Sequence, residues 1–240
     1  MNLVQTARLL EEGLSLSHPP IGMSFLQEPP TGIQRYSEAV PTACSFWKAA
    51  QTSLFYATAE DHYNCPIGAI TQGFQPPEEV MHQAMDLIDR MGKIQYFEVG
   101  EVPNVPAVEK PHQVVVYGPL KSFEKLSPDV VMMICTPSQA MLFSEATGDV
   151  AWRGPGTETH VFGRPACAVI PRALKDSATA VSLGCMGART FAGIQDHELL
   201  VAVPADRLAE TRNRLDTVLA ANKEMRKYYA DRKSQYAAVV

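Results

Sequence analysis

The chain has 240 residues, of which 46% are hydrophobic, which suits either one large globular domain or two small ones. Its formal net charge of −5 and pI of about 5.7 argue against a nucleic-acid binder, which normally carries a basic face. Because Glu11 and Glu12 interrupt the N-terminal apolar stretch and no window approaches the roughly 18 apolar residues of a membrane span, we expect no signal peptide, no membrane segment and a cytoplasmic location.

The first half of the chain alternates between helical and strand-like patterns. Apolar residues at helical spacing predict a short helix at the N-terminus, and the following Pro-Pro pair ends it. Short apolar runs that end in turn-forming residues predict strands. The predicted elements are a helix over 3–14, a strand over 21–26, a helix over 45–58, a helix from 77 to about 90, and a strand over 112–120.

The second half follows a similar order and ends in a long helix. A Gly/Pro-rich stretch at 152–156, with the sequence WRGPG, predicts a loop because it cannot continue a regular element. The other predicted elements are a strand over 129–137, a helix from 138 to about 146, strands over 178–184 and 198–204, and a helix from 205 to about 233. Together these elements predict an α/β (α+β) fold of mixed strands and helices.

The two halves, about 1–125 and 126–240, match weakly but in order, which suggests an internal repeat. IGMSFL corresponds to VVMMIC, CPIGA to CMGAR, and VVVYGPLKSF to LLVAVPADRL, while Cys44 corresponds to Cys167. We therefore expect one domain, 1–240, built of two pseudo-symmetric halves. A pseudo-twofold axis between them would bring both cysteine pairs to one interface.

Four cysteines lie where a thiolate would be stabilised. Cys65 and Cys185 each lie in a glycine-containing turn, where backbone N–H groups can point at sulfur. Cys44 and Cys167 each precede a predicted helix, whose dipole favours a negative charge at its N-terminus. Arg189 would also lower the pKa of a nearby thiol. Because thiolates are metal ligands, these four cysteines are the candidate metal site.

The remaining candidate residues and motifs add little to the predicted function. Cys135 lies inside an apolar strand without a glycine turn, so we interpret it as a core residue. His62 is expected at the surface, and no paired histidines occur. Zinc sites usually have cysteines two to four residues apart, a spacing that is absent here, whereas iron–sulfur clusters accept four thiolates from distant turns. No nucleophile elbow or catalytic triad order appears.

These motifs resemble the uncharacterised domain-of-unknown-function 169 family. The likeness runs from PPIGMSF through Cys44 and CPIGA to GRPAC and SLGCMGART, nearly the whole chain. The resemblance marks the same four cysteines as the site, with Gly68, Gly187 and Arg189 as supporting residues, and it has no counterpart of Cys135. Similar proteins occur in many anaerobic bacteria and archaea, which suits an oxygen-sensitive cluster, but the family has no assigned activity.

The leading hypothesis is a cytoplasmic iron–sulfur protein whose four cysteines hold a 4Fe-4S cluster for electron transfer or for redox chemistry on a small molecule. One alternative is a non-catalytic binder or carrier of a metal or tetrapyrrole, with haem or zinc as the cofactor. Another is a dithiol/disulfide redox protein. If the protein is an enzyme, we expect an oxidoreductase. The expected partner is a redox protein or a small molecule, and self-association is left open.

Overall fold

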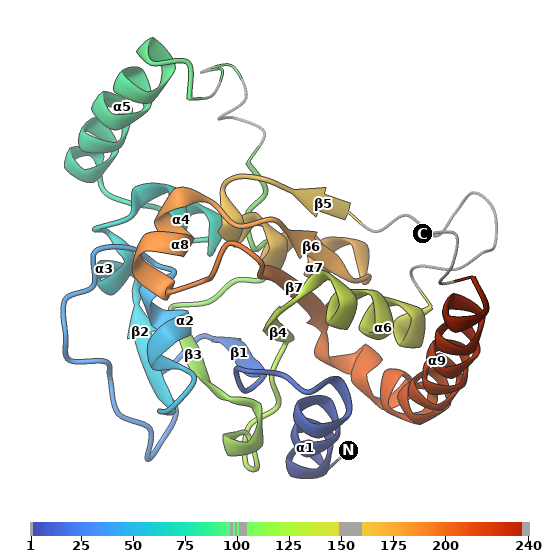
Figure 1. The fold of residues 1–240 in the computed structure, drawn as a ribbon. Coiled ribbons are helices and arrows are strands. Elements are labelled where there is room, and N and C mark those ends of the chain that lie inside the picture. The colour runs from blue at the N-terminus through green and yellow to red at the C-terminus, as the bar shows by residue number, and fades with distance from the viewer. Residues whose placement is uncertain (1, 97, 99, 101–104, 149–159, 237–240) are drawn as a thin grey trace.

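The computed structural model describes residues 2–236 apart from 97, 99, 101–104 and 149–159, and within them the chain forms one seven-stranded sheet. The strand order is β2-β3-β1-β4-β7-β6-β5, antiparallel throughout except for the parallel pair β5 and β6 (Figure 1). The strands are β1 (Ile21–Leu26), β2 (Phe55–Thr58), β3 (Val114–Pro119), β4 (Val130–Cys135), β5 (His160–Phe162), β6 (Ala180–Ser182) and β7 (Leu199–Pro204).

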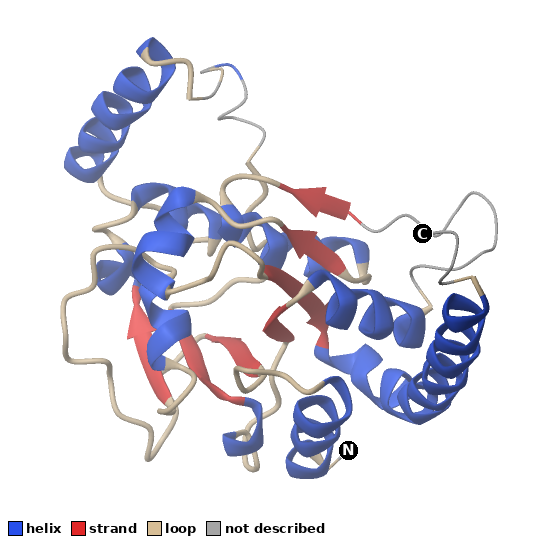
Figure 2. Cartoon of the chain, in the orientation of Figure 1, coloured by secondary structure: helices blue, strands red, loops and turns tan. Residues whose placement is uncertain are grey.

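Helices cover the sheet and complete the mixed α/β fold predicted from the sequence (Figure 2). The α-helices are α1 (Leu3–Leu14), α2 (Ser45–Ala49), α3 (Ala59–His62), α4 (Pro66–Thr71), α5 (Glu78–Lys93), α6 (Pro137–Thr147), α7 (Val169–Asp176), α8 (Met186–Ala192) and α9 (Leu208–Gln235). Short 3-10 helices are η2 (Leu120–Ser122), η3 (Ala166–Ala168) and η4 (Ala205–Arg207). The predicted long C-terminal helix is confirmed as α9.

The sheet separates two apolar cores because successive side chains of a strand point to opposite faces. One core lies under α1, α6 and α9, and the other lies under α2, α4, α7 and α8. In β4, for example, Ile134 belongs to the second of these cores, whereas its neighbour Cys135 belongs to the first. Any site built on α2, α4 and α8 therefore lies on the opposite face of the sheet from Cys135.

The helix predicted over 45–58 is wrong. Helix α2 ends at Ala49, and the last four residues of the range form β2, which pairs with β3. Phe55 and Ala57 are buried and alternate with half-buried neighbours, which is the period of two that a strand needs. Because the range 45–58 is rich in apolar residues, the sequence pattern alone does not show this short alternation.

The glycine turn predicted around Cys65 is also wrong, because Cys65 directly precedes α4 and Gly68 lies inside that helix. Cys185 directly precedes α8 and follows Gly184, whose φ is +81°. Pro66 occupies the first turn of α4, where its missing N–H leaves no lost hydrogen bond. The loop predicted at 152–156 lies outside the described residues.

The strand order places β1 and β4 next to each other, with β3 beside β1 and β7 beside β4. A 3-10 helix follows β3 and another follows β7, and the first residue of each forms a backbone hydrogen bond with the residue before β1 or β4. Leu120 N–H donates to the carbonyl oxygen of Pro20 at 2.8 Å, and Ala205 N–H donates to that of Asp129 at 3.0 Å. The duplication and the single-domain organisation stay predictions, but both halves contribute to one sheet.

Candidate functional site

The two cysteines of the first half lie at the starts of two short helices that a side chain ties together. Cys44 directly precedes α2 and Cys65 directly precedes α4. The side-chain amide of Asn64 donates to the carbonyl oxygen of Val40 at 2.9 Å, so the segments before the two helices lie side by side. Cys44 is buried, with 6% of its surface exposed, whereas Cys65 is half-buried.

Gly68 in α4 allows these two segments to approach each other closely. A β-carbon on Gly68 would lie 2.6 Å from Cβ of Ala43 and 2.9 Å from Sγ of Cys65, both too close for packed atoms. Ala43 is the residue before Cys44. Gly68, predicted as a supporting residue, therefore leaves the space in which the Cys65 sulfur and the start of α2 pack together.

Cys167 connects the second half of the chain to this arrangement. It lies in η3 and is buried, and its Sγ is 3.2 Å from Oγ1 of Thr71 in α4. Thr71 donates its hydroxyl proton to the carbonyl oxygen of Ile67. Because a hydroxyl has one proton, the Thr71 oxygen is left to accept from the Cys167 S–H. Since η3 packs on α4, Cys167 lies next to the helix that follows Cys65.

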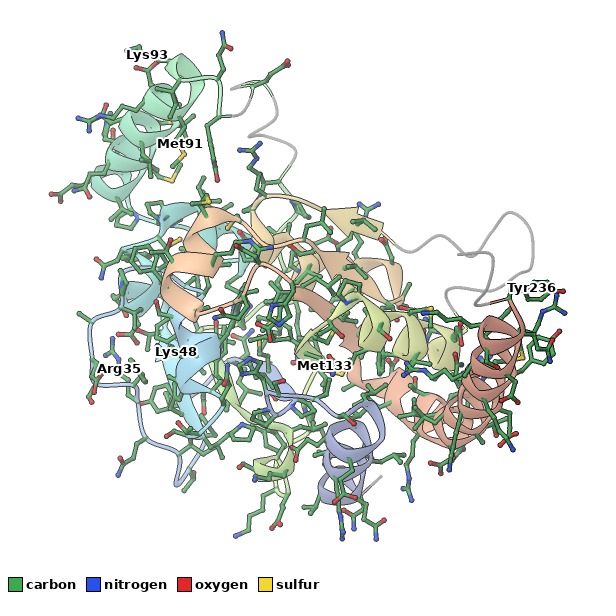
Figure 3. All side chains as sticks on the ribbon, viewed as in Figure 1. Arg35, Lys48, Met91, Lys93, Met133 and Tyr236 are labelled. Atoms are coloured by element: carbon green, nitrogen blue, oxygen red, sulfur yellow. The ribbon has the colours of Figure 1, made fainter. Side chains whose placement is uncertain are left out.

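Cys185, the fourth cysteine, lies beside the helix that follows Cys44. It is half-buried and directly precedes α8, which packs against α2. Figure 1 shows α8 between α4 and α2, and in Figure 3 the labelled side chain of Lys48 marks α2 on this face. The fold therefore packs the helix after Cys185 on the helix after Cys44, and Cys167 on the helix after Cys65, so elements of the two halves meet at these cysteines.

The thiols interact electrostatically, and two of them are held neutral. Burial, the largest cause, raises the pKa of Cys44 to about 12, and charge on Cys185 or Cys65 acts in the same direction. Burial also raises the pKa of Cys167 well above its usual value, followed by the effects of Cys65, Cys44 and Cys185. Cys44 and Cys167 are therefore protonated thiols at neutral pH.

A buried His–Tyr pair lies beside these thiols. His62, predicted at the surface, is only 1% exposed, and its Nε2 is 2.9 Å from the hydroxyl oxygen of Tyr117 in β3. Burial lowers the pKa of His62 to about 4. The pKa of Tyr117 is raised, first by burial and then by Cys167 and Cys44, which places its hydroxyl within electrostatic reach of both thiols. The sequence held no signal for this pair, because His62 and Tyr117 lie 55 residues apart along the chain.

The comparisons with known proteins agree with the resemblance seen in the cysteine motifs. The profile of the DUF169 family, described as "Uncharacterised ArCR", matches residues 9–214. The chain belongs to the DUF169 family. It is 26% identical over 216 residues to "Uncharacterized protein MJ0308" of Methanocaldococcus jannaschii, covering 86% of this chain and 90% of that relative. No solved structure matches this DUF169 protein. Because neither name states an activity, the reaction has to be inferred from the site.

The iron–sulfur function predicted for this DUF169 protein is wrong on the geometry of its side chains. In the part of the chain that the structure describes, no three His, Cys, Asp or Glu side chains are arranged so that they could hold a metal ion. The sequence shows how many cysteines exist but not where their sulfurs point. Which cofactor the chain takes stays a prediction, with haem or another tetrapyrrole and zinc as the alternatives.

Arg189 supports the loop around Cys185 rather than a cluster. Its guanidinium donates to the carbonyl oxygens of Leu183 at 2.6 Å and Gln195 at 2.5 Å, so it joins the two ends of the segment that contains α8. Gly187 has space around it, since a β-carbon there would lie 3.9 Å from Sγ of Cys185, an ordinary contact distance. Of the two predicted supporting glycines, only Gly68 is sterically required.

Cys135 is confirmed as a core residue of this DUF169 protein. It is 3% exposed and packs in the core under α1, α6 and α9, on the other face of the sheet from the four cysteines. Separately, none of the helices over residues 2–96, 105–148 and 160–236 combines the length and the apolar character that a membrane-crossing segment needs.

Proposed function

We propose that this DUF169 protein carries out thiol–disulfide exchange with a small disulfide, using thiols that pair across the two halves of the chain. The observation that supports the proposal is that four free cysteines lie on elements that pack across the two halves, α2 with α8 and η3 with α4, from which we infer the pairs Cys44 with Cys185 and Cys65 with Cys167. Each pair joins one buried thiol to one half-buried thiol. Thiol–disulfide exchange needs no metal. The proposed pairs differ from the pairs within each half of the sequence, Cys44 with Cys65 and Cys167 with Cys185.

The unequal burial of each pair assigns different roles to its two members. The half-buried thiol, Cys185 or Cys65, meets the small disulfide first. Its thiolate forms a bond to one sulfur of the disulfide, the disulfide bond breaks, and the other sulfur leaves as a thiolate that takes a proton from water. The buried neighbour, Cys44 or Cys167, then gives up its thiol proton and forms a bond to the protein sulfur of the mixed disulfide; the bond to the small-molecule sulfur breaks, and that sulfur leaves as a thiolate that takes up a proton.

The overall reaction balances without another reactant. Two protein thiols and one small disulfide give one protein disulfide and two small thiols, so the protein loses two electrons and two protons. Running in reverse, an oxidised protein pair would oxidise two small thiols. We place this chemistry in the cytoplasm, where thiols are kept reduced and a transient protein disulfide can be restored. On this account the protein is an oxidoreductase.

Oxidation of the reduced protein by a small disulfide tests the proposal. The protein would be incubated with oxidised glutathione, quenched with acid and examined by intact mass and thiol counting. We expect each protein disulfide to remove two hydrogen atoms from the protein mass and to release two glutathione molecules. Replacing both half-buried thiols, Cys65→Ser with Cys185→Ser, should abolish the rapid oxidation.

The matched control is Cys135→Ser, because that residue lies on the other face of the sheet. It should oxidise as the unchanged protein does. Persistence of all the free thiols would contradict the proposal. So would glutathione adducts that never resolve into protein disulfides.

A further inference from the structure

The two half-buried thiols differ in the free space beside their sulfurs. Apart from its chain neighbours and the backbone of its own helix, a β-carbon on Gly187 in α8 would have one described atom within 4 Å. That atom is Sγ of Cys185, at 3.9 Å. At Gly68 in α4 the same position is filled, because Cβ of Ala43 would lie 2.6 Å away and Sγ of Cys65 2.9 Å away. In the part of the chain that the structure describes, the Cys185 sulfur therefore borders open space and the Cys65 sulfur borders packed atoms.

The turn before α8 fixes the position of Cys185 beside this space. Gly184 has a φ of +81°, in the left-handed region that favours glycine. Its N–H donates to Oγ of Ser182 at 3.1 Å. The guanidinium of Arg189 donates to the carbonyl oxygen of Leu183 at 2.6 Å. Because these bonds hold the backbone on both sides of Gly184, the thiol of Cys185 is placed at the open space before any ligand binds.

Exposed apolar side chains lie on both sides of Cys185 along the chain. Leu183, two residues before it, is 52% exposed, and Met186, directly after it, is 62% exposed. The sequence over 182–188 contains no charged residue. The guanidinium of Arg189, which follows, is bonded to backbone carbonyl oxygens. Apolar surface of this kind favours a ligand whose own groups are apolar, because both surfaces leave water on contact.

We propose that Cys185 is the thiol that a small disulfide meets first, and that Leu183 and Met186 select disulfides with uncharged, apolar groups next to their sulfurs. This assignment rests on the proposed function and names its entry point and substrate class. After Cys185 gives its proton to water, its thiolate forms a bond to one sulfur of the disulfide in the space over Gly187. The disulfide bond breaks, and the other sulfur leaves as a thiolate that takes up a proton. Cys65 reacts later, because the space beside its sulfur is filled.

Diethyl disulfide, which is small and uncharged, tests the order of reaction. The reduced parent variant Cys44→Ser/Cys167→Ser would be treated with it and quenched with acid, so that each mixed disulfide stays on the thiol that formed it. Peptide mass spectrometry then times the adduct on each cysteine. We expect the adduct on Cys185 to form about tenfold faster than that on Cys65, because access limits the exchange rate. If the parent variant fails to fold, the loss of each free thiol in the unchanged protein gives the same order.

Side chains that fill the open space provide the next variants. Added to the parent variant, Gly187→Leu places a branched side chain next to the Cys185 sulfur and should slow its reaction about tenfold without changing that of Cys65. Gly187→Ala adds one ordinary contact and should slow it less. An unchanged Cys185 rate in Gly187→Leu would overturn the proposed entry point. So would a Cys65 thiol that reacts first in the parent variant.

Charge on the disulfide tests the substrate class. Cystamine and dithiodiglycolate are close to diethyl disulfide in size but carry positive and negative charges, and each rate at Cys185 would be divided by the rate with N-acetylcysteine. We expect a preference of about fivefold for diethyl disulfide, which is lost when Leu183→Ser/Met186→Ser is added. The matched control Met225→Ser removes an exposed apolar side chain from α9, on the other face of the sheet, and should keep the preference. Equal normalised rates, or a preference that survives in Leu183→Ser/Met186→Ser, would refute the selection.

These outcomes are separate from the proposed function. Protein disulfides could form with Cys65 reacting first, or with no preference among small disulfides, and either result would overturn only the inference about Cys185. Conversely, rapid adducts on Cys185 that no buried thiol resolves in the unchanged protein would contradict the exchange reaction and leave the entry point in place.

Discussion

Replacing Gly68 with alanine should destabilise the protein, whereas the same change at Gly187 should not. The two glycines lie near the starts of α4 and α8, next to Cys65 and Cys185. At Gly68 a β-carbon would lie 2.6 Å from Cβ of Ala43 and 2.9 Å from Sγ of Cys65. At Gly187 the nearest atom would be Sγ of Cys185 at 3.9 Å. The same substitution therefore meets a steric overlap at Gly68 and an ordinary van der Waals contact at Gly187.

The expected changes in the free energy of unfolding have opposite signs at the two glycines. Alanine in place of a helical glycine gains up to about 1 kcal/mol from helix propensity. At Gly68 the added methyl group overpacks the site at a cost of about 1–3 kcal/mol. Because Ala43 Cβ is fixed to the backbone and cannot rotate away, the upper part of that range applies, which leaves a net loss of about 2 kcal/mol. At Gly187 only the gain remains, at about 0.5–1 kcal/mol.

Urea unfolding of the reduced variants, followed by circular dichroism, measures both free energies of unfolding. Adding Ala43→Gly to Gly68→Ala removes the 2.6 Å overlap and should restore part of the lost stability, as a non-additive double mutant. A Gly68→Ala protein as stable as Gly187→Ala would refute the close packing of Cys65 against the start of α2. So would a rescue variant that is less stable than Gly68→Ala.

Three further changes test other parts of the structure. Because the folded-state pKa of His62 is about 4 against 6.5 when unfolded, its contribution to stability is complete above pH 6.5 and falls by about 3 kcal/mol on acidification to pH 4. Urea unfolding across this range should show a flatter dependence for His62→Gln, and equal slopes would contradict the buried neutral ring. Arg189→Lys should cost about 1–3 kcal/mol in thermal unfolding, because lysine cannot span the carbonyl oxygens that the guanidinium joins, while the exposed Arg8→Lys should cost almost nothing. Cys135→Ala should cost about 1–2 kcal/mol of stability yet leave glutathione-driven oxidation unchanged, and slower oxidation would link the two faces of the sheet.

The sequence predicts most of the scaffold because strong local patterns encode it. The N-terminal helix and β1 agree with prediction to the residue, since prolines follow the apolar stripe of the helix and lie on both sides of the continuous apolar run of the strand. Helix α2 and strand β2 share a continuous apolar region, and their boundary depends on pairing with β3, which is a long-range contact. The local sequence pattern alone therefore predicts one helix where the structure has a helix and a strand.

The site is only partly encoded in local sequence. The repeated spacing correctly separates four cysteines from Cys135, whose place in a continuous apolar strand predicts the core. The elements that pack around each cysteine come from both halves, such as η3 on α4, and no spacing reveals them. His62 shows the same limit, because it is predicted at the surface while its ring is buried against Tyr117. The directions of the sulfurs, on which the metal prediction depended, are likewise set by the tertiary fold.

Pairwise retention of the cysteines tests the central claim most directly. Four variants would each keep two of the four site cysteines, with the other site cysteines and Cys135 changed to serine, and their oxidation by oxidised glutathione would be timed by intact mass. The account predicts rapid disulfide formation in the variants that keep Cys44 with Cys185 or Cys65 with Cys167. It predicts slower formation in those that keep Cys44 with Cys65 or Cys167 with Cys185. Faster oxidation of the pairs within one half would contradict it.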